Sequence, residues 1–330
     1  METKKKYLKY VAIALVIVFV VSAALMLLEL WERKQDKLAS EQEIALSYKG
    51  VDYVHRDDVE TFLVMGLDKY ADAASSASHD SGVQADFLML FVFDNKTKEC
   101  SAIHINRDTM TTVNKLSIGG TTVVDTYTAQ IALAYNYVED DNDKIRCGNT
   151  KDSVEALLHG INVNHYLAVT MDSVAVTNDL VGGVEVEILD DFTGIEDHFK
   201  KGETITLTGE QALTYIRTRY GLEDNTNSHR MERQRQYLNA LKDKVLACMD
   251  EDENFALSLI DAVGQYVVYD STNQKMQKLA EKFAEYEFVG IREIDGEVIV
   301  GEEFMEFYPD EDALLQMVID LFCEKAEKRK

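Results

Sequence analysis

The chain has 330 residues, of which 46% are hydrophobic, and its 34 lysines and arginines are outnumbered by 59 aspartates and glutamates, for a formal charge of −25 at pH 7. This length and apolar content allow a substantial core, in one large domain or two smaller ones. The acidic balance argues against a nucleic-acid partner, because phosphate binding of that kind relies on a basic surface. Four cysteines without CxxC spacing argue against a zinc site and leave free thiols or disulfides open. They are Cys100, Cys147, Cys248 and Cys323.

An uncharged apolar run over residues 10–28 is near the lower length limit of a membrane-spanning helix. Four lysines precede it, whereas residues 29–37 carry both signs, so the positive-inside rule places the N-terminus in the cytoplasm and the bulk of the chain outside. We therefore expect a single-pass protein of the cell membrane. A cleaved signal peptide, with its cleavage site at Val21-Ser22-Ala23, is the alternative. The expected parts are a cytoplasmic tail (1–9), a transmembrane helix (10–30) and an extracytoplasmic stalk (31–56).

Three apolar runs after the stalk have the composition of buried strands. Charged residues stand at their ends: Asp68 after the first, Asp86 before the second, and Arg107 with Asp108 after the third. Ligand sites in open α/β sheets lie outside strand ends, and two carboxylates beside arginines could hold Mg²⁺ and a phosphate together. Polar residues that only terminate strands are the alternative. The three expected strands cover residues 61–65, 87–93 and 100–105.

The rest of the chain alternates between helical and strand patterns. Thr208 and Gln211 fit a capping box, so a helix should begin at Gly209, and we expect it to end near Arg217. We further expect helices over residues 129–137, 152–159, 172–180, 255–266, 274–286 and 312–328, and a long helix from near residue 230 to 249. Strands are expected over residues 166–171 and 184–188, and a hairpin over residues 289–300 around Asp295-Gly296. Cys147 should lie in a loop after the helix at residues 129–137.

Residues 211–236 hold five arginines against three acids, the reverse of the chain's overall balance. On a helix that begins near Arg230, both Arg230 and Gln234 continue the apolar face that should turn inward, because residues four apart share a face. A buried guanidinium is costly unless an anion meets it, and its planar fork suits carboxylate or phosphate. Two interpretations stay open, an anion site and structural arginine–carboxylate bridges. The five arginines are Arg217, Arg219, Arg230, Arg233 and Arg235.

Taken in order, a series of short segments resembles the LytR–CpsA–Psr family of cell-wall glycopolymer ligases, over roughly residues 60–245. Each segment is weak by itself, but their shared order is a strong indication of the fold. The segments are FLVMGLD (62–68), ADFLML (85–90), NRDT (106–109), ALAYNY (132–137), LVGGVEVEI (180–188), LTGEQALTYIRTR (207–219) and HRMERQ (229–234).

The resemblance implies an α/β/α sandwich with a mixed central sheet and a tunnel for a polyprenyl chain, preceded by the transmembrane helix. Residues 57–249 would form the catalytic domain, with residues 250–330 as a helical and hairpin extension packed on it. The implied reaction takes an anionic glycopolymer from a polyprenyl-pyrophosphate carrier at the membrane and gives it to a peptidoglycan hydroxyl. A phosphodiester forms and polyprenyl phosphate leaves. Catalysis would rest on positioning and charge neutralisation.

The resemblance also implies the roles of individual residues. Asp68 and Asp86 would hold Mg²⁺, and Arg107 and Asp108 would be catalytic, with Asp108 either orienting Arg107 or deprotonating the acceptor. His104, at the end of the third strand, is interpreted as structural rather than as a proton shuttle. The implied pyrophosphate ligands are Arg107, Arg217, Arg219, Arg230, Arg233 and Gln234.

Several positions depart from the family pattern, and each departure removes a charge or a fixed backbone angle from the site. We expect Lys69 to replace a missing arginine as a point charge.

The departures suggest an alternative function, a non-catalytic protein that binds polyprenyl-linked lipid as a scaffold or regulator of envelope assembly. A third interpretation, an anchored ectodomain without a lipid tunnel, predicts a filled core between sheet and helices. The departures are Lys69-Tyr70 for an arginine, Asn106 for a proline, Gln130 near a usual lysine and Asn227 for an aspartate.

Overall fold

The computed structural model of the protein describes residues 44–69, 83–223, 226–252, 254–302 and 304–326. The predicted transmembrane helix, residues 10–30, and the first part of the predicted stalk lie outside the described residues. Of the helices that the structure describes, none is long and apolar enough to cross a membrane. The chain divides into two compact units, one comprising residues 57–321 and the other residues 1–56 together with 322–330.

The described part of the smaller unit is a three-stranded antiparallel sheet in the order β1-β2-β15. Lys49 and Gly50 join β1 to β2, and both have positive φ, at 49° and 78°. Such two-residue turns match the twist of a hairpin. Residues 46–55, predicted as part of a stalk, are therefore a hairpin. The helix predicted over residues 312–328 ends at residue 322, and the strand that follows it pairs with this hairpin. The strands are β1 Leu46–Tyr48, β2 Val51–His55 and β15 Cys323–Lys325.

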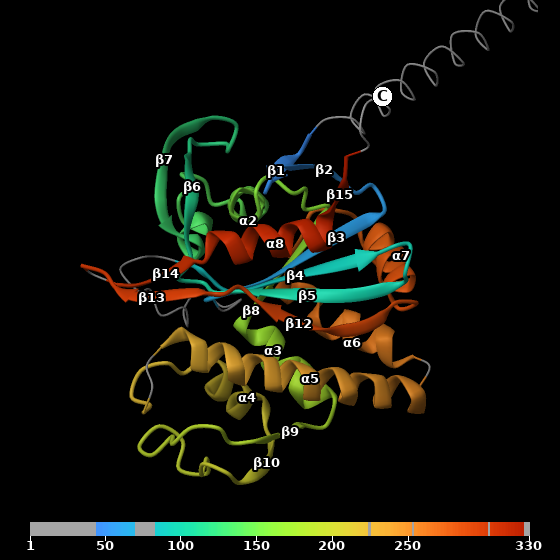
Figure 1. Ribbon diagram of the computed structural model, residues 1–330. Coiled ribbons are helices and arrows are strands. Elements are labelled where there is room, and N and C mark those ends of the chain that lie inside the picture. Colours follow the sequence, from blue (N-terminus) through green and yellow to red (C-terminus); the bar gives the residue numbers. More distant parts are fainter. Residues whose placement is uncertain (1–43, 70–82, 224–225, 253, 303, 327–330) are drawn as a thin grey trace, which may run out of the picture. The chain divides into compact units, whose positions relative to one another are not determined.

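The larger unit is built on a six-stranded sheet in the order β11-β8-β3-β4-β5-β12 (Figure 1). Strand β3 pairs antiparallel with β4 and parallel with β8, and β12 pairs parallel with β5, so the sheet is mixed. Leu63, Leu88 and Ile103 in its central strands have no exposed surface, as expected for strands covered on both faces. The strands are β3 Val59–Leu67, β4 Ala85–Asp94, β5 Glu99–Ile105, β8 His165–Thr170, β11 Val267–Tyr269 and β12 Glu287–Glu293.

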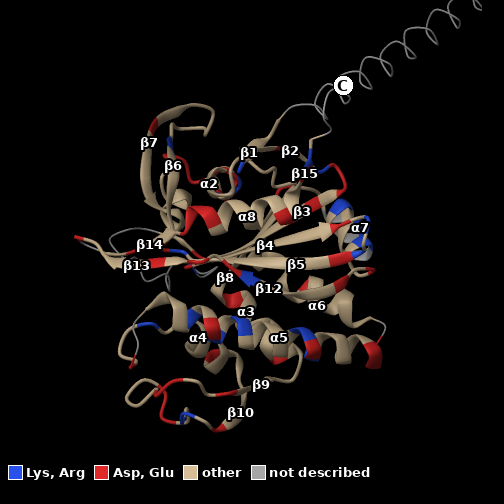
Figure 2. Cartoon of the chain, in the orientation of Figure 1, with Lys and Arg blue, Asp and Glu red and all other residues tan. Residues whose placement is uncertain are grey.

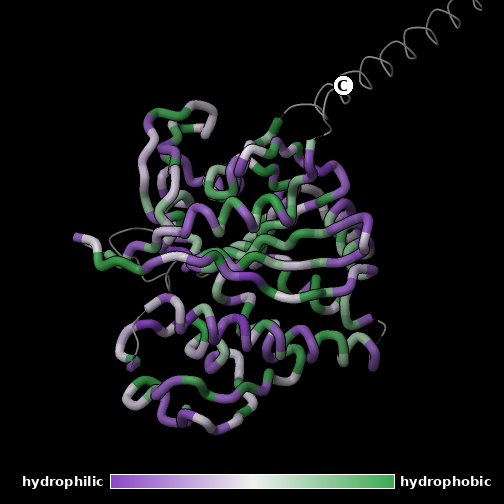
Figure 3. Tube along the Cα trace, viewed as in Figure 1, coloured by the Kyte–Doolittle hydropathy of each residue, from purple (hydrophilic) through white to green (hydrophobic). Residues whose placement is uncertain are grey.

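Helices cover both faces of this sheet, with α2 and α8 on one face and α3, α4 and α5 on the other (Figure 1). In Figure 3 hydrophobic residues concentrate in the central strands. Along the outer hairpins, hydrophobic and hydrophilic residues alternate. The predicted mixed α/β fold is confirmed. The helices are α2 Asp143–Leu157, α3 Met171–Leu180, α4 Gly209–Arg217, α5 Asn227–Glu251, α6 Phe255–Val263, α7 Asn273–Phe283 and α8 Glu311–Phe322, with 3₁₀ turns η1 Ile131–Tyr135 and η2 Gly264–Tyr266.

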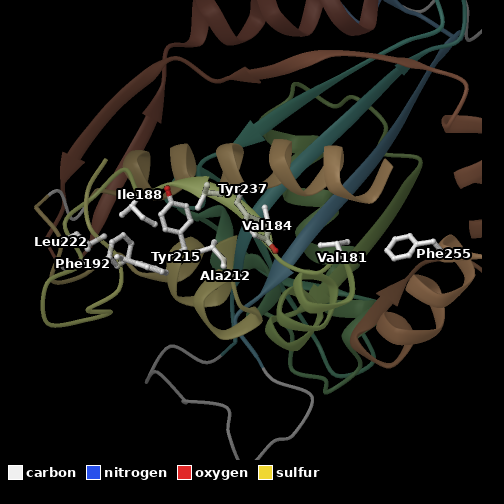
Figure 4. Close-up of a cluster of buried hydrophobic side chains, with 12 residues drawn as sticks. Val181, Val184, Ile188, Phe192, Ala212, Tyr215, Leu222, Tyr237 and Phe255 are labelled. Carbon is white, nitrogen blue, oxygen red and sulfur yellow. The ribbon is translucent and has the colours of Figure 1, made fainter. Parts of the chain in front are cut away.

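A second hydrophobic cluster fixes α4 and α5 to the β9–β10 hairpin (Figure 4). Tyr215 of α4 and Val184 of β9 are fully buried in it. The predicted capping box is present, since the Thr208 side chain accepts from Gln211 N while the Gln211 side chain accepts from Thr208 N, and α4 ends at Arg217 as predicted. Before β9, Gly183 has φ of 92° and a Cβ there would lie 2.9 Å from the Leu207 carbonyl oxygen, so only glycine fits. The hairpin strands are β9 Val184–Glu187 and β10 Thr204–Leu207.

Several predicted elements are wrong. Residues 129–137 are not an α-helix but the end of a strand followed by the short 3₁₀ helix η1, and Cys147 lies in α2 rather than in a loop. The hairpin predicted over residues 289–300 does not form. Its first half belongs to β12, which pairs with β5 and packs Phe288 into an aromatic cluster, and its second half, residues 296–300, pairs with β14. All four cysteines are free. The remaining strands are β6 Met110–Leu116 with β7 Val123–Gln130, and β13 Gly296–Val300 with β14 Met305–Pro309.

Residues after the predicted domain end at 249 supply two strands of the central sheet, β11 and β12, and the helix α8. As far as residue 321 they belong to the same compact unit as residues 57–249. They therefore form part of the fold that positions the site described next.

Candidate functional site

Most of the predicted site residues meet in one cleft with a volume of about 850 Å³. It lies at the ends of β3, β4 and β5 and is closed by residues at the end of α4 and in the first turns of α5. In Figure 2 basic positions stand on α4 and α5, whereas most of the charged positions of the β9–β10 segment are acidic. The predicted residues that line the cleft are Asp68, Asp86, Arg107, Asp108, Arg217, Arg219 and Arg230.

The strand pairing explains why residues far apart in sequence meet here. Strand β4 runs antiparallel to both β3 and β5, so the end of β3, the start of β4 and the end of β5 lie at the same edge of the sheet. Asp68 directly follows β3, Asp86 is the second residue of β4, and Arg107 stands two residues after β5. These are the strand ends where ligand sites of α/β sheets are found.

Asp86 is the centre of one group of ion pairs. Its Oδ1 accepts from Nη1 of Arg107, and its Oδ2 lies 3.3 Å from Nη1 of Arg230. Arg107 also donates to the Gln84 side-chain oxygen. Burial lowers the pKa of Arg230, and the charge of Asp86 opposes this shift. The Asp86 carboxylate thus offsets the free-energy cost of removing the Arg230 guanidinium from water.

Asp68 pairs with the last residue of α4, since Nη2 of Arg217 donates to its Oδ1 at 2.7 Å. Sequence reasoning placed this arginine at the helix end, where the chain leaves α4 and can turn its side chain toward the sheet. The pair joins the end of β3 to the end of α4 across the cleft.

Asp108 is held by hydrogen bonds from Gln130 and Arg219 and by an ion pair with Arg107. Its Oδ1 lies 3.3 Å from Nε of Arg107 and 3.1 Å from Nε2 of Gln130, and its Oδ2 lies 3.4 Å from Nη1 of Arg219. Burial raises the pKa of the Asp108 carboxyl, while Arg107 and Arg219 act in the opposite direction. With only 3% of the residue exposed, Asp108 is placed to orient the two arginines. This geometry favours the orienting role over deprotonation of an acceptor.

Arg233 does not line the cleft, so its prediction as a pyrophosphate ligand is wrong. Its Nε lies 3.3 Å from Oδ2 of Asp190, and its guanidinium lies over the rings of Phe192 and Tyr215 at 5.3 and 5.9 Å. Only 1% of the residue is exposed. Around the helix, Arg233 lies about 60° to one side of Arg230 and about 100° from Gln234, which turns it toward Phe192 and Tyr215 of the second hydrophobic cluster instead.

A second, apolar cavity of about 230 Å³ lies between the sheet and helices α3, α4 and α5. Gln234 lines it and donates from Nε2 to the Ile216 carbonyl oxygen at 3.2 Å. The inward orientation predicted for Arg230 and Gln234 is confirmed, with 4% and 7% exposed. The filled core expected from the third interpretation is wrong. Residues shared by the cavity and the cleft are Asp86, Arg217 and Arg230.

The structure places the positions that depart from the family pattern in different surroundings. Lys69 pairs with Asp143 at 2.5 Å and does not line the cleft, so the expectation that it replaces a missing arginine there is wrong. Gln130 does line the cleft and also donates to the Met305 carbonyl oxygen at 2.6 Å. Asn227 is buried and donates to Asn106 at 2.7 Å. Tyr70 lies outside the described residues.

The cleft offers oxygen ligands of the kind that Mg²⁺ prefers. Asp68 and Asp86 line it together with Gln84. Within the described residues, no three His, Cys, Asp or Glu side chains form a group that could hold a metal ion by themselves. Because Mg²⁺ commonly takes one or two carboxylates and completes its shell with water and substrate phosphates, the donor set fits this ion in the presence of a phosphorylated substrate.

Sequence reasoning missed several cleft residues. Gln84 immediately precedes β4, and its position next to a strand end was the only available signal. Tyr220 follows the Arg-Thr-Arg segment directly. Phe304 lies in the turn between β13 and β14, and nothing local connects it with cleft residues such as Arg107 and Arg217, which come much earlier in the chain.

Residues 25–319 match the LytR_cpsA_psr family, which is most of the chain. The protein belongs to this family. Among its relatives, the polyisoprenyl-teichoic acid–peptidoglycan teichoic acid transferase TagU of Bacillus licheniformis is 31% identical over 247 residues, covering 73% of this chain and 71% of TagU.

Solved structures of LytR–CpsA–Psr proteins share the fold. The TagV structure from B. subtilis has a TM-score of 0.57 at 23% identity, covering 81% of this chain and 96% of TagV. TagT bound to LIIa-WTA gives a TM-score of 0.56 at 21% identity, covering 80% of this chain and 90% of TagT. The mixed sheet flanked by helices is therefore the architecture of this family.

Proposed function

We propose that this protein is a membrane-anchored, extracytoplasmic phosphotransferase that moves an anionic glycopolymer from a polyprenyl-pyrophosphate carrier to peptidoglycan. One observation carries the proposal. The apolar cavity beneath the sheet and the arginine-lined cleft share Asp86, Arg217 and Arg230. A ligand with an apolar tail and a pyrophosphate head would place its tail among side chains such as Val174 and Leu238 and its head among the arginines.

The named relatives support the same chemistry. TagU is named for transfer of teichoic acid to peptidoglycan, and the family member TagT is known bound to a wall-teichoic-acid ligand. The uncharged run at residues 10–28, with lysines before it, supports anchoring in the membrane that carries the polyprenyl donor.

In the proposed reaction, a peptidoglycan hydroxyl attacks the phosphorus that carries the glycan. A new oxygen–phosphorus bond forms, the bond to the bridging oxygen breaks, and polyprenyl phosphate leaves with the electron pair. The hydroxyl proton passes to solvent. Arg107 and Arg230, released from Asp86, would bind the phosphates and neutralise the charge that develops on the leaving group. Asp108 would keep Arg107 and Arg219 oriented, so that catalysis depends on positioning.

Asp68 and Asp86 would hold Mg²⁺, and the ion would supply further neutralisation of phosphate charge when bound. Both carboxylates pair with arginines in the described structure. Ion and arginines therefore have complementary roles, because a cation that takes over the carboxylates leaves the guanidinium groups for the pyrophosphate.

The experiment uses the full-length chain in detergent and a short-chain polyprenyl-pyrophosphate saccharide. Binding is measured by calorimetry and release of polyprenyl phosphate by mass spectrometry, with and without Mg²⁺ and a peptidoglycan acceptor. Replacing both Arg217 and Arg219 by alanine should weaken binding about a hundredfold and abolish release, since each lost charged hydrogen bond is worth about 1.5–3 kcal/mol. Arg292→Ala, at an exposed position of β12, is the matched control.

A second candidate, a non-catalytic protein that binds polyprenyl-linked lipid, is favoured by one observation. Gln130 lines the cleft near the position where the family usually has a lysine, and no lysine is among the described residues that line it. Binding without release, even with acceptor and Mg²⁺ present, would support this candidate. Failure to bind the lipid at all would contradict both.

A further inference from the structure

Two exposed aromatic side chains line the arginine cleft. Tyr220 is 72% exposed and Phe304 is 58% exposed. Single exposed aromatic residues are ordinary on a protein surface. These two are distinguished by their position, because they come from distant parts of the chain and meet at the same cleft as Arg217 and Arg230.

Tyr220 is held in place by an arginine of the cleft. The guanidinium of Arg219 lies 4.7 Å from the ring centre of Tyr220 and also contacts its hydroxyl. Arg219 is itself fixed by Asp108, at 3.4 Å. The ring is thus attached to the same network that orients the predicted catalytic arginine.

Phe304 is tied to the floor of the cleft through the β13–β14 hairpin. The Phe307 amide donates to the Asp108 carbonyl oxygen at 2.9 Å, and the Met305 carbonyl oxygen accepts from Gln130 at 2.6 Å. The Phe304 carbonyl oxygen accepts from the Gly301 amide at 2.9 Å, which closes the turn. In Figure 1 this hairpin extends past the edge of the sheet. The C-terminal part of the chain therefore contributes an aromatic ring to the site.

The cavity and the cleft together offer three environments: apolar side chains in the cavity, arginines among the residues that the two share, and exposed aromatic rings in the cleft alone. A polyprenyl-pyrophosphate glycan has the same sequence of chemistry: lipid, phosphates, sugar. A pyranose ring presents a face of C–H groups that packs on an aromatic ring, while its hydroxyls can stay hydrated at an exposed site.

We propose that Tyr220 and Phe304 form a subsite for a pyranose ring next to the pyrophosphate. The inference rests on the proposed function and adds the residues that recognise the sugar. The pyranose belongs either to the donor glycan or to the acceptor, since both present this chemistry at the reacting phosphate, and the experiment has an arm for each.

The test compares two ligands that differ only in the sugar, a polyprenyl pyrophosphate and the same lipid carrying a disaccharide, on the full-length chain. The wild-type protein should bind the sugar-bearing ligand about tenfold more tightly. In the Tyr220→Leu, Phe304→Leu double variant this ratio should fall to about twofold or less. The ratio cancels any change that loss of the Tyr220 ring causes at Arg219. Tyr308→Leu, which changes an exposed aromatic residue of β14 outside the cleft, should keep the wild-type ratio.

A second arm titrates a soluble peptidoglycan disaccharide into protein already saturated with the sugar-free lipid. Loss of disaccharide binding in the double variant, with an unchanged donor ratio, would support the subsite and assign it to the acceptor. A wild-type protein that binds the lipid but shows neither a sugar-dependent ratio nor disaccharide binding would overturn the inference and leave the proposed function intact. The same holds if the donor ratio and the disaccharide binding both survive unchanged in the double variant. If neither lipid binds, the inference and the proposed function fail together.

The Tyr220→Phe, Phe304→Trp variant, which retains both rings, should restore the ratio.

Discussion

Nη1 of Arg230 lies 3.3 Å from Oδ2 of Asp86, and the two side chains are only 5% and 13% exposed. This pair reconciles the two interpretations of the arginine-rich segment, structural bridges and an anion site. The arginine is met by a carboxylate of the protein, and both residues line the cleft. If the site binds pyrophosphate next to apolar side chains, as proposed, it needs such internal counter-charges, because an unpaired buried guanidinium is costly.

Replacing Arg230 by alanine should therefore impair stability as well as binding. Asp86 would lose one of its two arginines and stay largely buried, so the free energy of unfolding should fall by about 3 kcal/mol. Urea denaturation monitored by circular dichroism measures this. The Arg230→Ala, Asp86→Asn double variant removes both charges and should regain part of the stability without regaining pyrophosphate binding. If the double variant is no more stable than Arg230→Ala, the unpaired carboxylate is not the cause.

His104 should make the fold sensitive to acid. Burial, with Arg235 and Arg230 of α5 nearby, lowers the pKa of His104 to about 3. Around it, the ring of Phe87 lies 5.1 Å away, and Glu293 of the neighbouring β12 pairs with Arg235. The unfolded chain binds a proton near pH 6.5 that the folded chain does not, so stability is present above that pH. It is lost as the pH falls toward 3, by up to about 1.4 kcal/mol per pH unit.

The change that tests this is His104→Phe, which keeps a ring against Phe87 and cannot be protonated. The difference in unfolding free energy between the variant and the wild type should move in favour of the variant as the pH falls from 7 to 4. His198→Phe serves as the control, because the side chain of His198 is 82% exposed. A difference for His104→Phe that stays constant across this range would contradict the prediction.

Filling the apolar cavity should separate lipid binding from phosphate binding. Val174 of α3 lines the cavity, and a tryptophan there would occupy space that the proposed lipid tail needs. Each CH₂ group kept in water forfeits about 0.8 kcal/mol, so Val174→Trp should weaken binding of polyprenyl pyrophosphate more than about tenfold. Inorganic pyrophosphate should bind as before. Leu180→Trp, at an exposed position of the same helix, is the control. Equal losses for both ligands would indicate general misfolding instead of a blocked cavity.

Local pattern was sufficient for part of this site. Asp68 and Asp86 stand next to apolar runs that had to be central strands, and the capping box at Thr208 set the helix that ends at Arg217. Arg233 was assigned wrongly because its motif neighbours Arg230 and Gln234 face the sheet, while it faces the second hydrophobic cluster.

The contributions from distant segments could not be predicted in this way. The turn signal at Asp295-Gly296 was read as one hairpin, although β12 instead pairs parallel with β5 and β13 with β14. Which partner a strand takes depends on packing between segments far apart in sequence, to which a local pattern is blind. For the same reason the sequence did not indicate that Phe304 would reach the cleft.

Gln130→Lys should strengthen the anion site. Nε2 of Gln130 donates to Oδ1 of Asp108 at 3.1 Å and to the Met305 carbonyl oxygen at 2.6 Å. A lysine ammonium has three donors, so it can keep both contacts while adding a positive charge to the cleft. It would also lower the pKa of Asp108, which burial now raises, and so hold the carboxylate ionised against Arg107 and Arg219.

Calorimetry with inorganic pyrophosphate at low and high salt measures the effect. Affinity should rise about three- to tenfold at low salt, and the gain should shrink at high salt, because an added charge acts through a screened interaction. Gln130→Met, which keeps the length of the side chain and removes both donors, should instead weaken binding and lower stability, since Asp108 and the Met305 carbonyl lose a buried partner. A lysine variant that folds normally but binds pyrophosphate no more tightly than the wild type would show that the charge at this position does not reach the phosphates. The glutamine would then serve only to fix the β13–β14 hairpin to the cleft.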